Sequence, residues 1–170
     1  MSIATRRGDQ GETDLLYGGR VPKYHLQTET YGALHEANAA LGLARALLPK
    51  GPLKDDTLRI QKELIIVGAK LACDPAHLHR LKERIDEVHA QRLDHSLAEA
   101  EAKSPVTDWV IPGESPPSAA FHLASTIVRR TERWAVKLRD EGLLKNPHLL
   151  TYLNRLADLL FMYGKLSEDI

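Results

Sequence analysis

The sequence has almost no cysteine, few aromatic residues and no net charge. Its 170 residues include a single cysteine, Cys73, so neither an internal disulfide nor a cysteine-based zinc site can form. Lysine and arginine total 23, and aspartate and glutamate also total 23. This balance argues against a domain whose main ligand is nucleic acid, although a small anion needs only a local basic cluster.

Long apolar segments are also missing. The longest apolar run, residues 64–73, is interrupted by Lys70, and the first residues contain no apolar signal core. We therefore expect no membrane span and a cytoplasmic setting. The length is enough for one domain with a sizeable hydrophobic core.

Five segments repeat apolar residues at the three- and four-residue steps of an amphipathic helix. Proline and glycine separate them, and no internal repeat or convincing strand is found. Short connections between long amphipathic helices favour an antiparallel bundle. The five apolar stripes are Leu34, Ala37, Leu41, Ala44 and Leu48; Ile60, Leu64, Val67 and Leu71; Leu78, Leu81, Ile85 and Val88, in a helix continuing to about Ala100; Ala120, Ala124, Ile127, Trp134 and Leu138; and Leu149, Leu153, Leu156, Leu160 and Tyr163.

The last two of these helices carry a second, polar stripe that a simple bundle does not need. Taken alone, such a stripe is most often a solvated face. The stripe residues are His122, Ser125, Arg129 and Arg133, flanked by Arg130 and Glu132, on the fourth helix, and Thr151, Asn154, Asp158 and Lys165 on the fifth.

The stretch TRRGDQGET, residues 5–13, precedes any hydrophobic segment. It brings arginines, glycines, acids and hydroxyl groups together within nine residues. Such a stretch is either a frayed polar tail or a loop that binds an anion through backbone amides, hydroxyls and guanidinium groups.

Several blocks of the sequence resemble the PduO-type ATP:corrinoid adenosyltransferases. In order, they are IATRRGDQGETDLLYGGRVPK, ETYGALHEANAALG, IQKELIIVGAKLA, WVIPGESPPSAAFHLASTIVRRTERWAVKL and NPHLLTYLNRLADLLFMYGK. The resemblance spans nearly the whole chain and keeps the order of the family's motifs. It implies one all-α domain, a five-helix antiparallel bundle over residues 28–170, with an N-terminal ATP-binding loop over residues 1–27.

The resemblance also implies a reaction. The 5′-deoxyadenosyl group of ATP is transferred to the cobalt of a reduced corrinoid such as cobalamin, and triphosphate is released. Because Co(I) is itself the nucleophile, the protein's tasks are to align cobalt with the 5′ carbon and to stabilise the leaving group. Further implications are Mg²⁺, a homotrimer with sites at subunit interfaces, and a reductase or corrinoid-dependent enzyme as partner. Neither nucleic acid nor a membrane is an expected partner.

Residue by residue, the resemblance assigns the N-terminal loop to the triphosphate. Glycines let the backbone approach the phosphates, and arginine and threonine supply donors. Arg129 and Asn154 are expected to act on ATP directly, and Glu132 to hold Mg²⁺. Trp109 either helps to displace the lower corrinoid ligand or anchors its loop in the core. The other implied nucleotide-binding residues are Thr5, Arg6, Gly8, Asp9, Gly11, Thr13, Lys23 and Arg133, the last of which could equally make a subunit or surface ion pair.

Some positions depart from the family's pattern. His35 and Ser125 stand where the family has an aspartate and an arginine that form a salt bridge beside the corrinoid. Because both halves are replaced, no buried charge is left unpaired. Glu114 replaces a glycine of the loop, and Arg7 replaces a threonine of the N-terminal stretch.

Because His35 and Ser125 mark the corrinoid site, two interpretations stay open. The chain is an adenosyltransferase with an altered corrinoid pocket, or a non-catalytic or repurposed relative that binds a tetrapyrrole, corrinoid or haem, with a histidine as axial ligand. A trimeric scaffold without a ligand is a third interpretation, and it leaves the anion-binding residues without a purpose.

Overall fold

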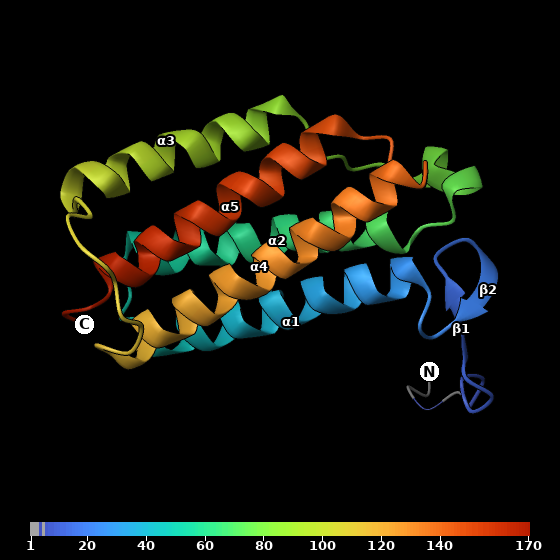
Figure 1. The fold of residues 1–170 in the computed structure, drawn as a ribbon, viewed down its shortest axis with the longest axis horizontal. Coiled ribbons are helices and arrows are strands. Elements are labelled where there is room, and N and C mark those ends of the chain that lie inside the picture. Colours follow the sequence, from blue (N-terminus) through green and yellow to red (C-terminus); the bar gives the residue numbers. More distant parts are fainter. Residues whose placement is uncertain (1–3, 5) are drawn as a thin grey trace.

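The computed structural model describes residue 4 and residues 6–170. Over these residues, long α-helices run side by side and successive ones are antiparallel, which confirms the predicted helical bundle (Figure 1). A short 3-10 helix, η1 (Pro75–Arg80), lies between the second and third. The α-helices are α1 (Leu26–Leu47), α2 (Pro52–Ala72), α3 (Glu87–Lys103), α4 (Pro116–Asp140) and α5 (Pro147–Leu166).

The predicted apolar stripes form the core. α1 packs against α2 and α4, α4 packs against α5, and α5 packs against α3. The stripes of α1, α2 and α5 are buried throughout, whereas Ile127 and Trp134 of α4 are only half-buried. Polar side chains fix the helix starts: the Ser115 hydroxyl accepts from the Ser118 amide, and the Asn146 side chain accepts from the His148 amide.

The predicted start of the third helix is wrong. Residues 75–80 form η1, residues 81–86 are irregular, and α3 begins only at Glu87. Asp86 caps it by accepting from the amide of His89, whose ring reaches back to the Asp86 amide. The apolar residues before Asp86 have helical spacing although they precede α3. Val88, the one residue of the predicted stripe that lies within α3, is exposed.

The expectation of no strand is also wrong. β1 (Glu12–Leu15) and β2 (Gly18–Pro22) form an antiparallel hairpin. The hairpin is tied to the bundle at Leu16, whose amide donates to the Ala72 carbonyl at 2.8 Å and whose carbonyl accepts from the Asp74 amide at 3.1 Å. A Cβ at Gly18 would lie 2.6 Å from Asp74 Oδ2, so only glycine permits this close approach.

The elongated bundle has two distinct ends (Figure 1). The hairpin end carries β1, β2, η1 and the beginnings of α1, α3 and α5. The loop end carries residues 104–115 and the C-terminus. The two are far apart, because the 25 residues of α4 alone span roughly 37 Å. In the described part of the chain, no helix has the length and apolar character needed to cross a membrane.

Candidate functional site

The N-terminal loop folds into tight turns beside Lys23. The Asp9 amide donates to the Arg6 carbonyl at 3.4 Å, and the Gly11 amide donates to the Gly8 carbonyl at 3.2 Å. A Cβ at Gly8 would lie 3.1 Å from both Cε and Nζ of Lys23, so the lysine side chain lies across the loop at the glycine. The structure thus brings Lys23 to the predicted loop. Thr5 lies outside the described residues.

Ion pairs hold this loop on the hairpin. Arg7, which replaces a threonine of the family's pattern, pairs with Asp14 at 3.0 Å. Arg20 contacts Asp14 at 3.3 Å and Glu12 at 3.2 Å, and it donates to the Arg7 carbonyl at 2.8 Å. Thr13 sits on β1 between these charged groups. All the pairs are exposed, so they orient the loop more than they stabilise the fold.

A second cluster joins the polar stripes of α4 and α5. Arg129 pairs with Asp158 at 2.8 Å, and Asn154 Nδ2 donates to Glu132 Oε1 at 3.1 Å. Arg155 donates to Asn154 Oδ1 at 2.7 Å, which orients the amide group. The predicted residues Arg129, Glu132 and Asn154 therefore lie on one partly exposed face, with a cation, a carboxylate and an amide side by side.

The other predicted cations on these helices lie outside this cluster. Arg133 is exposed, and within the described residues it has no carboxylate partner closer than 4.0 Å. Arg130 pairs with Glu36 of α1. Lys165 pairs with Glu168 at 2.6 Å, near the loop end.

His35 and Ser125 do not meet within one chain. Ser125 is buried between α4 and α5, where its hydroxyl donates to the Ala157 carbonyl at 2.7 Å. His35 is exposed on α1, and its ring centroid lies 5.7 Å from that of Tyr31. Their expected meeting across a subunit interface stays a prediction.

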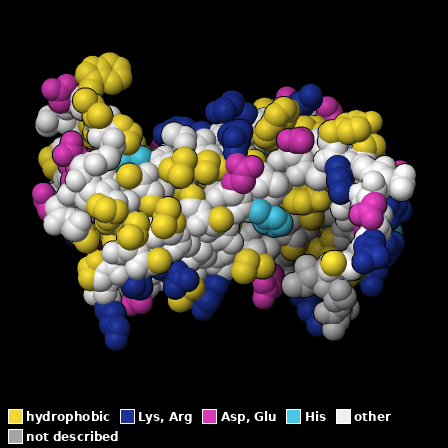
Figure 2. All heavy atoms as spheres, turned by 90° about the horizontal axis from the view of Figure 1, so that it is seen from below, with side chains coloured by type: hydrophobic (Ala, Val, Ile, Leu, Met, Phe, Trp, Pro, Cys, Tyr) yellow, Lys and Arg dark blue, Asp and Glu magenta, His cyan; other side chains and the backbone are white. Residues whose placement is uncertain are grey.

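Trp109 is 95% exposed, so the alternative in which it anchors its loop in the core is wrong. It lines an open apolar hollow of about 660 Å³ together with Val106, Val110 and Phe161. Hydrophobic side chains project from the loop end, as Figure 2 shows. A neighbouring hollow contains Trp109, Glu114 and Lys165. Sequence reasoning did not single out Phe161, because in α5 it reads as one more apolar residue of a leucine-rich helix.

Behind this hollow lies the buried His122. Its ring packs edge-on against Phe161, with centroids 5.2 Å apart, and Nε2 has no hydrogen-bond partner among the described residues. Gly164 makes room for it, since a Cβ there would lie 2.7 Å from Nε2. Burial lowers the pKa of His122, with smaller effects from Glu168, which raises it, and Lys165, which lowers it.

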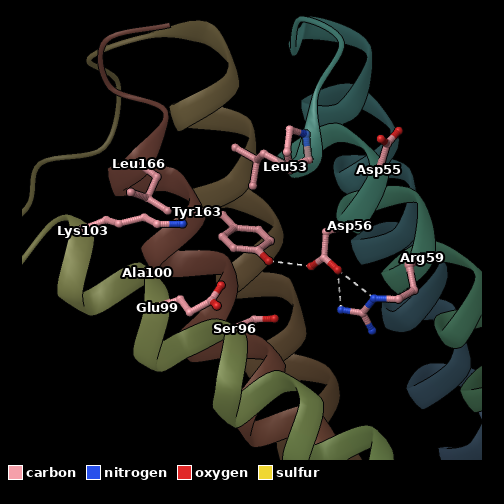
Figure 3. Close-up of a pocket in the computed structure, with 11 residues that line it drawn as sticks. Leu53, Asp55, Asp56, Arg59, Ser96, Glu99, Ala100, Lys103, Tyr163 and Leu166 are labelled. Atoms are coloured by element: carbon pink, nitrogen blue, oxygen red, sulfur yellow. Dashed lines mark hydrogen bonds and ion pairs between the residues drawn. The ribbon is translucent and has the colours of Figure 1, made fainter.

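An open pocket of about 660 Å³ lies between α2, α3 and α5 (Figure 3). In it Asp56 accepts from the Tyr163 hydroxyl at 2.5 Å and pairs with Arg59 at 2.7 Å. Burial, together with Asp56, raises the pKa of Tyr163. None of the residues predicted for the site lines this cavity, so the cavity and the predicted site are separate features.

Comparison with known proteins supports the family resemblance over nearly the whole chain. A family profile described as cobalamin adenosyltransferase matches residues 3–166. A corrinoid adenosyltransferase of Citrobacter freundii is 36% identical over 167 residues, which cover 98% of this chain and 94% of that protein. The corrinoid adenosyltransferase PduO of Salmonella typhimurium is 34% identical over 174 residues, but the chain spans 50% of its length.

Solved structures that are similar to this chain come from the same family. A variant PduO-type ATP:corrinoid adenosyltransferase from Lactobacillus reuteri, complexed with cobalamin and ATP, superposes with a TM-score of 0.88. It is 28% identical, and the match covers 98% of this chain and 93% of that one. A second variant from the same organism, complexed with ATP, superposes with a TM-score of 0.87.

Proposed function

The chain belongs to the cobalamin adenosyltransferase family, and from this premise we propose how its own residues carry out the family's reaction. It is an ATP:corrinoid adenosyltransferase, which transfers the 5′-deoxyadenosyl group of ATP to the cobalt of a reduced corrinoid. Cobalt supplies the electron pair of the new Co–C bond, and the C5′–O bond breaks with its electrons on triphosphate. Nothing in the comparisons favours the alternative of a repurposed haem or corrinoid carrier.

The hairpin end holds the triphosphate in this proposal. Arg6, Lys23 and the glycine turns at Gly8 and Gly11 bring positive charge and close-approaching backbone to one loop. The ion pairs of Arg7 and Arg20 fix that loop on the hairpin. A loop held in place before ATP arrives loses less conformational entropy on binding.

Arg129 and Asn154 act on ATP from the α4–α5 face. Arg129 exchanges Asp158 for a phosphate oxygen, because both are anionic acceptors of a guanidinium fork. Asn154 is oriented by Arg155 and hydrogen-bonds the nucleotide. Both residues would thereby stabilise the charge that develops on the leaving triphosphate, and electrostatic stabilisation of this kind is a major contribution in enzymes generally.

A magnesium ion fits the same face. The described residues contain no group of three or more His, Cys, Asp or Glu side chains placed to hold a metal. Mg²⁺ commonly takes one carboxylate together with phosphate oxygens and water, and Glu132 beside Asn154 offers such a carboxylate. When bound, the ion would neutralise charge on the phosphates.

The loop end receives the corrinoid. Trp109 and Phe161 provide an apolar wall for one face of the flat ring, and this wall excludes water and axial ligands from the cobalt. Since one electron must be supplied to reduce Co(II) to Co(I) before transfer, a reductase is a further partner in this proposal. The N-terminal loop of the nucleotide site and this wall lie at opposite ends of one chain, so we propose that a homotrimer brings them together between neighbouring subunits.

The observation that carries this proposal is the full-length family match, combined with the cluster of Arg129, Glu132 and Asn154. The test is to mix the purified protein with chemically reduced cobalamin, ATP and Mg²⁺ and to record the absorption spectrum. We expect the spectrum of adenosylcobalamin to appear, and to fail to appear when ATP is omitted. Binding of both ligands without any adenosylcobalamin would contradict the proposed activity.

A further inference from the structure

A pocket of about 510 Å³ at the hairpin end has a charge pattern that the proposed reaction does not use. Its floor consists of leucine and isoleucine side chains from η1, the segment before α3 and the α4–α5 connection. Its rim carries Lys70, Arg84, Lys145 and His148, together with a single carboxylate, Asp86. We call this the basic pocket. None of the residues assigned to ATP or to the corrinoid lines it.

The cations of the basic pocket have no anionic partner. Among the described residues, no carboxylate lies within 4.0 Å of the charged groups of Lys70, Arg84 or Lys145. Asp86 offsets only one of the three positive charges, and its carboxylate caps α3 and contacts His89 at 2.6 Å rather than any of these cations. With His148 neutral, the rim has a formal charge of about +2 in a concave site, where facing charges reinforce one another.

The two neighbouring helices add to this potential. α3 and α5 both begin at the pocket, since Asp86 and Asn146 are their N-cap residues and both line it. The N-terminus of a helix carries a partial positive charge. Three unpaired cations and two helix starts therefore face the same concave space.

We propose that the basic pocket is a second, non-catalytic binding site for a small organic phosphate. Lys70, Arg84 and Lys145 take the phosphate, and the apolar floor takes the body of the molecule. The volume suits a molecule the size of a nucleoside monophosphate, since ligand pockets commonly measure about 300–1,000 Å³. An inorganic anion would leave the apolar floor exposed to water. The cations and the apolar floor together therefore favour an organic phosphate.

The site lies against the anchor of the hairpin. Lys70 is in the last turn of α2, and Ala72 in the same turn accepts from the Leu16 amide. Arg80 of η1 stacks over the ring of Tyr17 at 4.2 Å. A molecule bound to Lys70 thus contacts the turn of α2 that holds the hairpin and its ATP loop.

Adenosine monophosphate is the probe, and titration calorimetry is the measurement. The protein carries Arg129→Ala throughout, so that binding at the proposed catalytic site is weakened. In this background, Lys145→Glu and Arg84→Glu are each expected to weaken AMP binding by about tenfold or more, because one phosphate contact is replaced by repulsion. The matched control is Lys82→Glu, an exposed lysine of the same segment that does not line the pocket, and it should change the affinity less than about twofold.

Inorganic triphosphate, titrated in parallel, separates the two sources of phosphate. Because triphosphate also binds the intact N-terminal loop, the effect of Lys145→Glu is compared for the two probes. We expect this variant to weaken AMP binding more than triphosphate binding, and an equal or larger loss for triphosphate would overturn the assignment to an organic phosphate. Equal AMP affinity in Lys145→Glu, Arg84→Glu and Lys82→Glu, or no AMP binding, would overturn the site itself. Neither result depends on adenosyl transfer, so a failure here is distinguishable from a failure of the proposed function.

Discussion

Arg129 pairs with Asp158 at 2.8 Å, with both side chains partly exposed. In the proposed function, ATP takes the place of Asp158 at this guanidinium. Losing one charge-assisted contact costs about 1.5–3 kcal/mol. We therefore expect Arg129→Ala to weaken ATP binding by roughly 10- to 100-fold in titration calorimetry, with about 1.4 kcal/mol per tenfold change.

Two variants keep this prediction specific. Arg139→Ala removes another exposed arginine of α4, which pairs with the adjacent Asp140, and should leave ATP affinity unchanged. Asp158→Asn removes the competing carboxylate and should strengthen ATP binding. Equal ATP affinity in the wild-type protein and Arg129→Ala would refute the role of Arg129.

The buried His122 makes the free energy of unfolding depend on pH. Burial lowers its pKa in the folded state below the ordinary value of about 6.5. Above pH 6.5 the imidazole is neutral in both states, and this part of the stability is fully present. As the pH falls through 6.5, the unfolded chain takes up a proton that the folded chain does not, so the free energy of unfolding decreases until the folded-state pKa is reached.

We expect His122→Gln to remove this contribution. The free energy of unfolding from urea titration at pH 7 and pH 5 should fall less steeply in His122→Gln than in the wild-type protein. The difference is at most about 1.4 kcal/mol per pH unit for one proton. His95→Gln, at an exposed position on α3, is the control and should keep the wild-type slope. An unchanged slope in His122→Gln would contradict this prediction.

At the scale of the elements, Glu63 connects three helices. This buried residue of α2 accepts from Arg59 of the same helix at 2.7 Å, from Arg92 of α3 at 2.6 Å and from the Tyr152 hydroxyl of α5 at 2.8 Å. Burial first, and then Glu63, raises the pKa of Tyr152 well above its ordinary value. α3 and α5 pack against each other, but the backbone of α2 packs closely against neither of them, so the network helps to hold α2 to these two helices.

Removing the carboxylate should therefore destabilise the bundle strongly. Glu63→Ala leaves two guanidinium groups and a buried hydroxyl without their shared partner. We expect a loss of about 3–5 kcal/mol in the free energy of unfolding by urea. The control is Asp94→Ala, which breaks an exposed pair with Arg155 and should cost about 1 kcal/mol or less. Similar losses in both variants would show that Glu63 does not join the helices.

The sequence predicts some of these elements well and others poorly. The stripes of α1, α2 and α5 are governed by local periodicity, so their buried faces follow directly from the apolar spacing. The start of α3 depends on the cap at Asp86, and upstream of it apolar spacing continues without a helix. The hairpin depends on the contact of Leu16 with the end of α2, which lies far along the chain.

In the candidate site, too, residues within local motifs could be predicted and those that depend on long-range contacts could not. Arg129, Glu132 and Asn154 were found because each falls within a motif of the family. Phe161 and the Glu63 network were missed, since the partners come from different helices and no local pattern joins them. Glu63 and Tyr152 are separated by 89 residues. Chemistry that depends on long-range packing requires the structure.

At the scale of the whole molecule, Lys23 and Trp109 belong to opposite ends of the bundle (Figure 1). The adenosyl group must nevertheless pass directly from ATP to the corrinoid. If both residues serve one reaction, they come from different chains, which requires an oligomer. We expect light scattering to give three times the chain mass at micromolar concentration, and a monomer would count against the interfacial site.

Mixing two defective variants tests this arrangement directly. Lys23→Ala impairs the nucleotide loop and Trp109→Ala impairs the corrinoid wall, so each variant alone should be strongly impaired in adenosylcobalamin formation. When equal amounts are unfolded together and refolded, random assembly gives sites that take the intact loop from one chain and the intact wall from its neighbour. Activity should then recover to about one quarter of the wild-type value, since each half is intact with a probability of about one half. Refolding each variant separately before mixing is the control and should give no recovery. If the two residues instead served a site within one chain, every chain would keep its own defect, and co-refolding would restore nothing.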